Sequence, residues 1–120
     1  MALTKFQLKI CREEYELINR VVSYAVASFE VVDLPSLFEK ETLESFLVKF
    51  DSKKFKLQNK YCFSFNAVEM FIFIKHVGYT MRQMGTYEET VYRMLYDQQI
   101  ALQVSRAVQI RINYSHKNNV

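Results

Sequence analysis

The chain has 120 residues, half of them apolar and 24% charged, and its formal net charge is +3. A chain of this length builds one core, and this composition excludes a disordered or collagen-like protein. Because only two glycines and one proline are present, an all-β sandwich and a Gly-rich phosphate loop are excluded as well. We therefore expect one α+β domain over residues 1–120.

The cysteines and the apolar segments indicate the compartment. Cys11 and Cys62 allow one disulfide at most, and with the two histidines they lack the ligand spacing of a zinc site. We expect two free thiols, no metal and no cofactor. The N-terminus lacks an apolar signal-peptide core, and the longest apolar stretch, residues 67–74, is too short to span a bilayer. These features predict a cytoplasmic protein without a membrane partner.

One strand and two helices are predicted in the first part of the chain. Alternation of polar and apolar residues over 4–10 predicts a half-buried strand, and apolar residues at helical spacing predict a helix over about 12–29. Ser36 and Glu39 have the spacing of a capping box, which predicts the start of a second helix that extends to about residue 50. Its expected core face consists of Leu43, Phe46, Leu47 and Phe50.

A second alternating segment covers residues 54–65. It predicts one long strand, or a hairpin that turns near residues 58–59. One face of this segment is polar and rich in lysine, and the other is apolar. The expected apolar face consists of Phe55, Leu57, Tyr61, Phe63 and Phe65.

A helix is predicted directly after residue 65. Asn66, with Glu69 three residues later, predicts the N-cap of a helix over 67–77. This helix is apolar nearly all round, so we expect it to be the buried central element. Gly78 or Gly85 is expected to end it.

The last helix is predicted to begin at the capping-box pattern of Thr86 and Glu89. Residues 108–114 alternate as a strand would, yet no helix-breaking residue precedes them. We expect the helix to continue to about residue 113, and a short C-terminal strand is the alternative. Residues 114–120 are expected to be a polar tail.

The chain also shows a weak internal repeat. A shift of 55 positions lays residues 5–22 over residues 60–77, with three identical residues among 18 pairs. Because the identities are few, the match depends on the shared strand-then-helix pattern. We expect two strand–helix–helix units, residues 3–50 and 53–113, that build a small antiparallel sheet packed with about four helices.

Catalytic residues are not predicted. Glu14 and Glu69 occupy equivalent positions in the two units, but each is the third residue of its helix, where glutamate commonly closes a cap. Nothing in the sequence fixes His76 or His116 near a carboxylate, as an acid–base site would require. A small hydrolase or nuclease is therefore only the third hypothesis.

The basic residues are segregated along the chain. Residues 3–10, 53–65 and 98–120 carry nine basic residues and no acidic one, whereas the remainder carries seven basic and thirteen acidic residues. A polar sheet face with this charge would attract phosphates, although lysines also protect exposed strands from aggregation. Alternation places the aromatic rings on the opposite, buried side, which would leave phosphate contact without base stacking. The candidate phosphate contacts are Lys5, Lys9, Lys54, Lys56 and Lys60.

The preferred function is a non-catalytic protein-interaction or self-assembly module, as a homodimer or with another protein. Tyr87, Tyr92 and Tyr96 are the candidate partner interface, with a role at the rim of the core as the alternative. A small sheet with open edges is marginal alone, and a twofold dimer could join those edges. A nucleic-acid-binding accessory protein that uses the basic sheet face is the second hypothesis.

Overall fold

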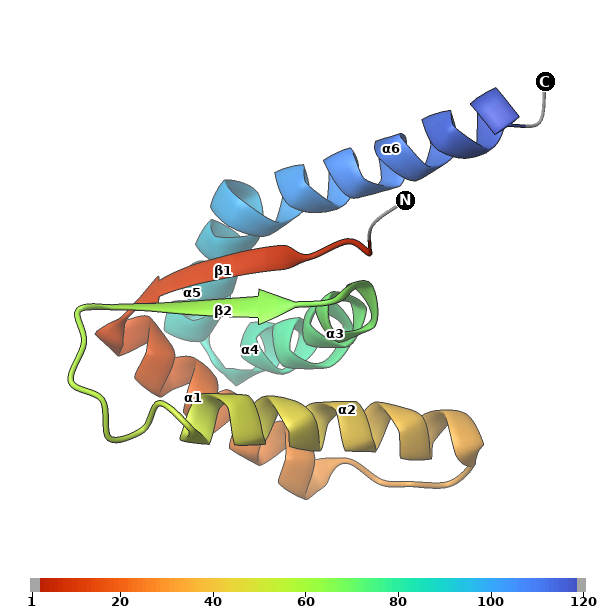
Figure 1. Ribbon diagram of the computed structural model, residues 1–120. Helices are drawn as coiled ribbons and strands as arrows, with labels where there is room; N and C mark the ends of the chain where they lie inside the picture. The colour runs from red at the N-terminus through yellow and green to blue at the C-terminus, as the bar shows by residue number, and fades with distance from the viewer. Residues whose placement is uncertain (1–2, 119–120) are drawn as a thin grey trace.

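The computed structural model describes residues 3–118 and has an α+β architecture (Figure 1). Two strands, β1 (Phe6–Cys11) and β2 (Lys60–Phe65), form an antiparallel sheet. The remaining elements are α1 (Arg12–Ser28), α2 (Leu34–Asp51), α3 (Ala67–Ile72), η1 (Phe73–Gly78), α4 (Tyr79–Met84), α5 (Thr86–Leu95), η2 (Tyr96–Ile100) and α6 (Ala101–Asn118). The wide π-helical segments η1 and η2 join their neighbours without a break, so four continuous helices result. The predicted class, a small antiparallel sheet with about four helices, is confirmed.

The sheet buries one face and exposes the other. In the antiparallel register, Phe6 lies opposite Phe65 and Ile10 lies opposite Tyr61, and all four side chains are buried. Leu8 and Phe63 are buried as well, whereas the residues that alternate with these in both strands are exposed. The alternation predicted over residues 4–10 is therefore confirmed, and it turns the aromatic face of the sheet toward the helices.

The second strand is shorter than the sequence suggests. The prediction of a strand or hairpin over residues 54–65 is wrong for its first half, because residues 52–59 form a turn and a loop. Phe55 and Leu57, expected on the buried face, are 88% and 80% exposed. The physical reason lies in the partner strand: β1 ends at Cys11, opposite Lys60, so the residues before Lys60 have no strand to pair with.

The start of α2 corrects one predicted cap. Asp33, not Ser36, is the N-cap: its Oδ1 accepts the Ser36 N–H at 2.8 Å, and the Ser36 hydroxyl accepts the Asp33 N–H at 2.9 Å. Pro35 lies in the first turn, where its missing N–H costs nothing. The Asp33 carboxylate is the stronger acceptor, and the hydrogen bonds from Ser36 lower the pKa of Asp33.

Of the other two predicted caps, one is confirmed and one is wrong. The Asn66 side chain accepts the Glu69 N–H at 2.8 Å, and Glu69 accepts the Asn66 N–H at 2.9 Å, as predicted. The Thr86–Glu89 prediction is wrong, because Thr86 is already helical and Gly85 is the N-cap. Gly85 has an extended backbone, and its carbonyl accepts the Glu89 N–H at 3.0 Å.

The helix over residues 67–84 does not end at Gly78. That glycine lies inside η1, where a Cβ atom would come within 2.4 Å of Cζ of the buried Tyr92 ring. The helix therefore passes through Gly78 and ends before Gly85. The expectation that it is the buried central element is wrong for one side of the helix, since Val68 and Phe71 are exposed.

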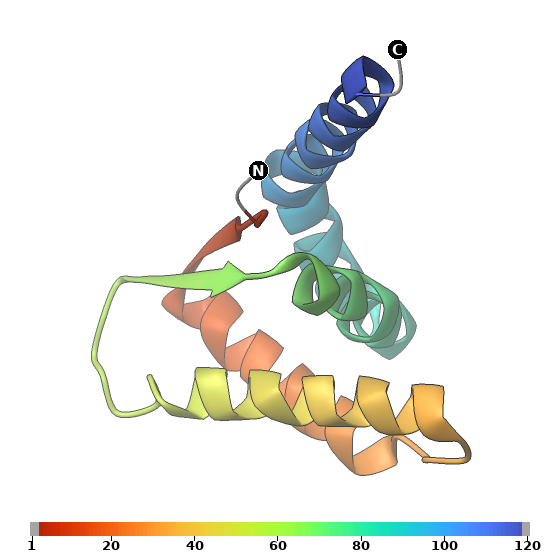
Figure 2. The same cartoon turned by 45° about the vertical axis from the view of Figure 1, so that its right-hand side comes forward.

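The C-terminal region is helical. α6 continues to Asn118, so the alternative of a terminal strand is wrong, and the helix extends beyond its predicted end near residue 113. Residues 119–120 lie outside the described residues. The strand-like alternation over 108–114 places apolar side chains around the helix, and α6 extends away from the other helices in both views (Figures 1 and 2).

The core lies between the inner face of the sheet and the helices. Phe46, Phe50, Phe65 and Phe73 are fully buried. The rings of Phe46 and Phe73 pack on Phe65, and those of Phe50 and Phe65 pack on Phe63. At one end of this cluster the Tyr15 ring stacks on Tyr61 at 4.2 Å, and its hydroxyl donates a hydrogen bond to the Phe50 carbonyl. Burial raises the pKa of Tyr15. Leu43 is buried as predicted, whereas Leu47 is only partly buried.

Candidate functional site

An apolar groove lies between α3 and α6. It has a volume of about 700 Å³, and the start of β1 forms its floor. We call this surface the α3–α6 groove. Its large apolar lining residues and Ala107 are Leu3, Phe6, Val68, Met70, Phe71, Ile74, Val104, Ala107, Val108 and Ile112. Large apolar patches of this kind mark interaction sites in monomeric proteins.

Two local features position the walls of this groove. The Asn66 cap starts α3 directly where β2 ends, and this fixes the exposed side of α3, with Phe71 58% exposed. The opposite wall is α6, whose residues 108–117 are all exposed. Val108 and Ile112, one turn apart on α6, face the groove and are 52% and 54% exposed.

Two glutamines, Gln99 in η2 and Gln103 in α6, attach the C-terminal helix to the sheet. The Gln103 side chain accepts the Gln7 N–H at 2.8 Å and donates to the Gln7 carbonyl at 2.7 Å. Gln99 makes the same pair of bonds with Lys9, at 2.8 and 2.6 Å. A carboxamide offers the donor and the acceptor that a neighbouring strand would offer, so these two side chains replace a third strand at the outer edge of β1.

The outer edge of β2 is covered differently. Lys49 Nζ donates to the Ser64 carbonyl at 2.8 Å, and Lys53 Nζ donates to the Cys62 carbonyl at 2.6 Å. Lys49 also pairs with Glu69 at 2.8 Å. A dimer that joins sheet edges would have to displace Gln99 and Gln103 from the edge of β1.

The candidate phosphate-contacting lysines lie on two neighbouring surfaces. Lys5, Lys9 and Lys60 lie on or beside the outer face of the sheet, and Lys54 and Lys56 lie in the loop before β2. Lys60 lies opposite Cys11 and Lys9 opposite Cys62, so Lys9 and Lys60 are diagonal neighbours. All five are exposed, and none forms an ion pair within residues 3–117.

The three candidate interface tyrosines do not form one surface. Tyr87 is exposed, and it lines a polar hollow with Arg12, Glu16 and Lys54 among others. Tyr92 is buried, and burial raises its pKa. Tyr96 is partly buried against the core, with its ring 6.1 Å from that of Tyr92. Only Tyr87 is therefore accessible over most of its side chain.

The titratable residues form structural ties. Glu39 on α2 accepts from Lys75 at 2.6 Å and lies 3.2 Å from His76 Nε2, which ties α2 to η1. The hydrogen bond from Lys75 is the main cause that lowers the pKa of Glu39. Glu14 accepts the Cys11 N–H at 2.8 Å, so it closes the start of α1. Both cysteines are free and exposed, and residues 3–118 contain no group of three or more metal-binding side chains.

Sequence reasoning missed the glutamines, the groove and the exposed Phe55. Gln99 and Gln103 are four residues apart on a helix that was expected to present apolar residues, and this spacing was the available signal. The groove has no local signal, because it depends on the direction in which α6 leaves the sheet.

The comparisons with known proteins add no relatives. No protein-family model, curated protein or solved structure matches this chain. Within the described residues, no helix combines the length and the apolar character needed to cross a bilayer. The function must therefore be argued from the geometry.

Proposed function

We propose that this chain is a non-catalytic self-assembly module that forms a twofold homodimer through the α3–α6 groove. The observation that carries the proposal is that one wall of the apolar groove, α6, is itself an exposed helix with apolar residues. Each leucine-sized side chain that becomes buried contributes about 1.5–3 kcal/mol. A second copy can supply both surfaces at once, as a twofold interface requires.

The composition of α6 supports the need for a partner. Its last eleven residues include Val108, Ile110 and Ile112, which are β-branched and weak helix formers. This segment ends a continuous helix and is exposed over residues 108–117, whereas most helical stability in proteins comes from tertiary packing. Packing against another helix would stabilise this segment as it stabilises most protein helices.

The proposed occupant of the groove is α6 of the second copy, in antiparallel orientation. A twofold axis near Val108 sets Val104 of one copy opposite Ile112 of the other, and it brings the partner helix against Phe71. In this register residue 117 of one copy lies opposite residue 99 of the other, so the C-terminal end of each α6 reaches the start of the partner's α6. Both α6 helices then gain an apolar neighbour along the face that lines the groove.

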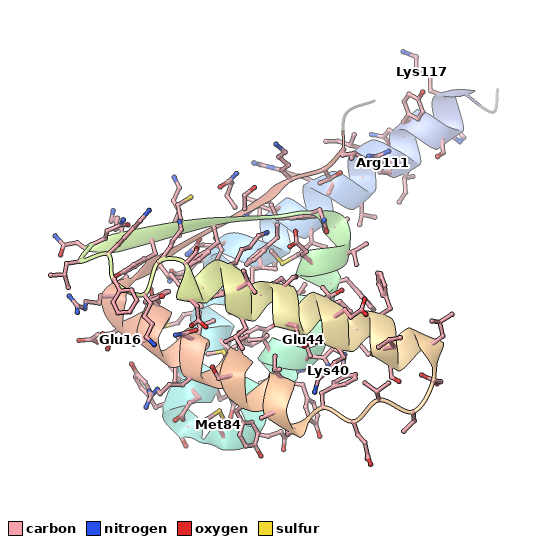
Figure 3. The ribbon with its side chains drawn as sticks, turned by 60° about the horizontal axis from the view of Figure 1, so that its bottom comes forward. Glu16, Lys40, Glu44, Met84, Arg111 and Lys117 are labelled. Atoms are coloured by element: carbon pink, nitrogen blue, oxygen red, sulfur yellow. The ribbon has the colours of Figure 1, made fainter. Side chains whose placement is uncertain are left out.

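Opposite charges on the two surfaces add to this attraction. α6 carries Arg106, Arg111 and Lys117 and no acidic residue, and Figure 3 shows Arg111 and Lys117 along the projecting helix. A second hollow, which includes Glu41 of α2, adjoins the groove through Asn66 and Val68. Glu41 and Glu44 are exposed and form no ion pair within residues 3–117. They would attract the basic partner helix as it approaches.

Two finer features belong to this proposal. We propose that the chain consists of two strand–helix–helix units, residues 3–50 and 53–113. The glutamate-closed helix starts at Cys11 and Asn66 support this division, since they lie 55 positions apart and each follows a strand of the antiparallel pair. A reducing cytoplasmic setting fits the two free, exposed thiols.

The test is the molar mass in solution over a dilution series, by light scattering and sedimentation. We expect the native chain to be dimeric and Ile112→Asp to be monomeric. Ile110→Asp is the matched control, because Ile110 is 57% exposed on the same helix but does not line the groove. A native chain that is monomeric at every concentration contradicts the proposal, and so does equal dissociation by both variants.

The contribution of these charges is tested by charge exchange. Lys117→Glu and Glu41→Lys should each weaken the dimer, and the double variant should recover affinity at low salt. If the single variants dissociate the dimer without any recovery in the double variant, the charges of α6 and α2 do not attract each other in the dimer.

A further inference from the structure

A turn before β2 displays an aromatic ring to solvent. The Lys56 N–H donates to the Lys53 carbonyl at 3.1 Å, which closes a turn with Lys54 and Phe55 at its tip. The buried Tyr61 hydroxyl donates to the Lys56 carbonyl at 2.8 Å and holds this turn against the sheet. The 88% exposure of Phe55 is therefore a property of a hydrogen-bonded turn.

Lysines surround this ring and continue onto the sheet. Residues 53–65 contain four lysines and no acidic residue. Lys54 Nζ lies 5.6 Å from the centre of the Phe55 ring. Lys60, Lys9 and Lys5 follow along the outer face of the strands, and nitrogen-ended side chains stand along that side of the sheet in Figure 3. The four-residue step from Lys5 to Lys9 spans roughly 13 Å of strand.

Protection of the strand edge does not account for these lysines. Lys49 and Lys53 already bond the carbonyls on the outer edge of β2, which is the protective role that edge lysines have. The five candidate phosphate-contacting lysines bond no backbone carbonyl and no carboxylate within residues 3–117. They are Lys5, Lys9, Lys54, Lys56 and Lys60. A row of unpaired cations attracts a polyanion by counterion release.

We propose that this surface, the turn with Phe55 and the row of five lysines, binds single-stranded nucleic acid. A base would stack on the open face of Phe55, and the lysines would contact successive phosphates. Proteins that bind single strands combine such a ring with a positively charged track. The lysines form an elongated row, which favours a linear polyanion. Binding to an anionic bilayer would need the cations and apolar residues of the protein to lie in one plane that faces the membrane.

The exposure of Phe55 removes the objection that every aromatic ring of this segment lies on the buried side, and the proposed nucleic-acid surface does not depend on the dimer. The aromatic residues of the second strand were all expected on the buried face, whereas Phe55 is outside the strand and exposed. Neither Phe55 nor the five lysines line the α3–α6 groove. Failure of one proposal therefore leaves the other standing.

The test is fluorescence anisotropy with a labelled oligothymidine or oligouridine and a duplex of equal length, at several salt concentrations. We expect tighter binding to the single strands, and about tenfold weaker single-strand binding by Phe55→Ala. Leu57→Ala is the matched control, because Leu57 is equally exposed in the same loop but has no ring, and it should bind as the native chain does. Lys54→Glu/Lys56→Glu/Lys60→Glu should abolish binding, and neutralising one of these lysines should lower the salt slope by about 0.7.

Three results would overturn the inference. One is no binding at low salt. Another is equal binding to duplex with no effect of Phe55→Ala, which would show phosphate contact alone. The third is stronger binding to vesicles that contain anionic lipid, weakened alike by Phe55→Ala and Leu57→Ala. Circular dichroism of each variant establishes that the fold is retained.

Discussion

The two sides of the helix over residues 67–84 have opposite environments. On the inner side, Phe73 and Val77 have no exposed surface, and Gly78 lies against the Tyr92 ring. On the outer side, Phe71 is two positions from Phe73 and yet is 58% exposed in the wall of the α3–α6 groove. Apolar residues on the inner side therefore stabilise the fold, whereas those on the outer side are available for association.

Phe73→Ala tests the inner side and should have the largest effect. Phe73 is fully buried, and its ring packs 5.6 Å from that of Phe65. Removing a buried phenylalanine ring leaves a cavity, so we expect a loss of about 3–5 kcal/mol in the free energy of unfolding. Urea unfolding followed by circular dichroism measures it. A loss below about 1 kcal/mol would mean that this side is not part of the core.

Gly78→Ala should have the next largest effect. The added methyl group would lie 2.4 Å from Tyr92 Cζ, and a clash inside a packed core costs about 1–3 kcal/mol. Gly85→Ala is the control, since its methyl group meets only the flexible Glu88 side chain, at 2.9 Å. We expect the second variant to unfold within about 1 kcal/mol of the native chain. Equal losses in both would remove the argument for a close approach at Gly78.

Glu39→Gln tests the tie between this helix and α2, and its effect depends on pH. The hydrogen bond from Lys75 lowers the pKa of Glu39 in the folded chain. The stabilisation is therefore present above the ordinary glutamate pKa and disappears as the pH falls through the lower, folded value. At neutral pH we expect a loss of about 1 kcal/mol. Unfolding measured from neutral to acidic pH should show the native chain and the variant converging in acid, and a constant difference would contradict this origin.

Phe71→Ala should have the smallest effect on folding. Because Phe71 is exposed, we expect the free energy of unfolding of the monomer, measured at concentrations below dissociation, to change by less than about 0.5 kcal/mol. The same variant should weaken the proposed dimer, which sedimentation measures. A large loss of monomer stability would show that Phe71 belongs to the core and would end the comparison between the two sides.

Local signals predicted part of this fold. The alternation of residues 4–10, the helical spacing over 12–29 and the Asn66 cap each depend on neighbouring residues, and the structure confirms them. Residues 54–59 alternate in the same way, but a strand needs a partner, and β1 ends at Cys11. At the start of α2 the prediction took Ser36 as the cap, whereas Asp33 caps the helix and Pro35 lies in its first turn.

The candidate surfaces were less accessible to sequence reasoning. Local sequence predicted the positions of Lys9 and Lys60 on the outer sheet face, because strand alternation fixes the side on which a residue lies. It placed Phe55 on the wrong side, because the loop does not continue the strand. The role of Gln99 and Gln103 depends on contacts across 90 and 96 positions of the chain, and no window of neighbouring residues contains that information.

Those long-range contacts have a consequence for synthesis on the ribosome. Gln7 and Lys9 of β1 emerge 96 and 90 residues before Gln103 and Gln99, whose amides cover the edge of the strand. Until they emerge, the N–H and carbonyl groups of Gln7 and Lys9 remain open to a strand from another nascent chain. A chain stopped before residue 99 should therefore aggregate more readily than the full chain. The segment that carries Gln99 and Gln103 can therefore protect the first strand from such pairing only after it has been synthesised.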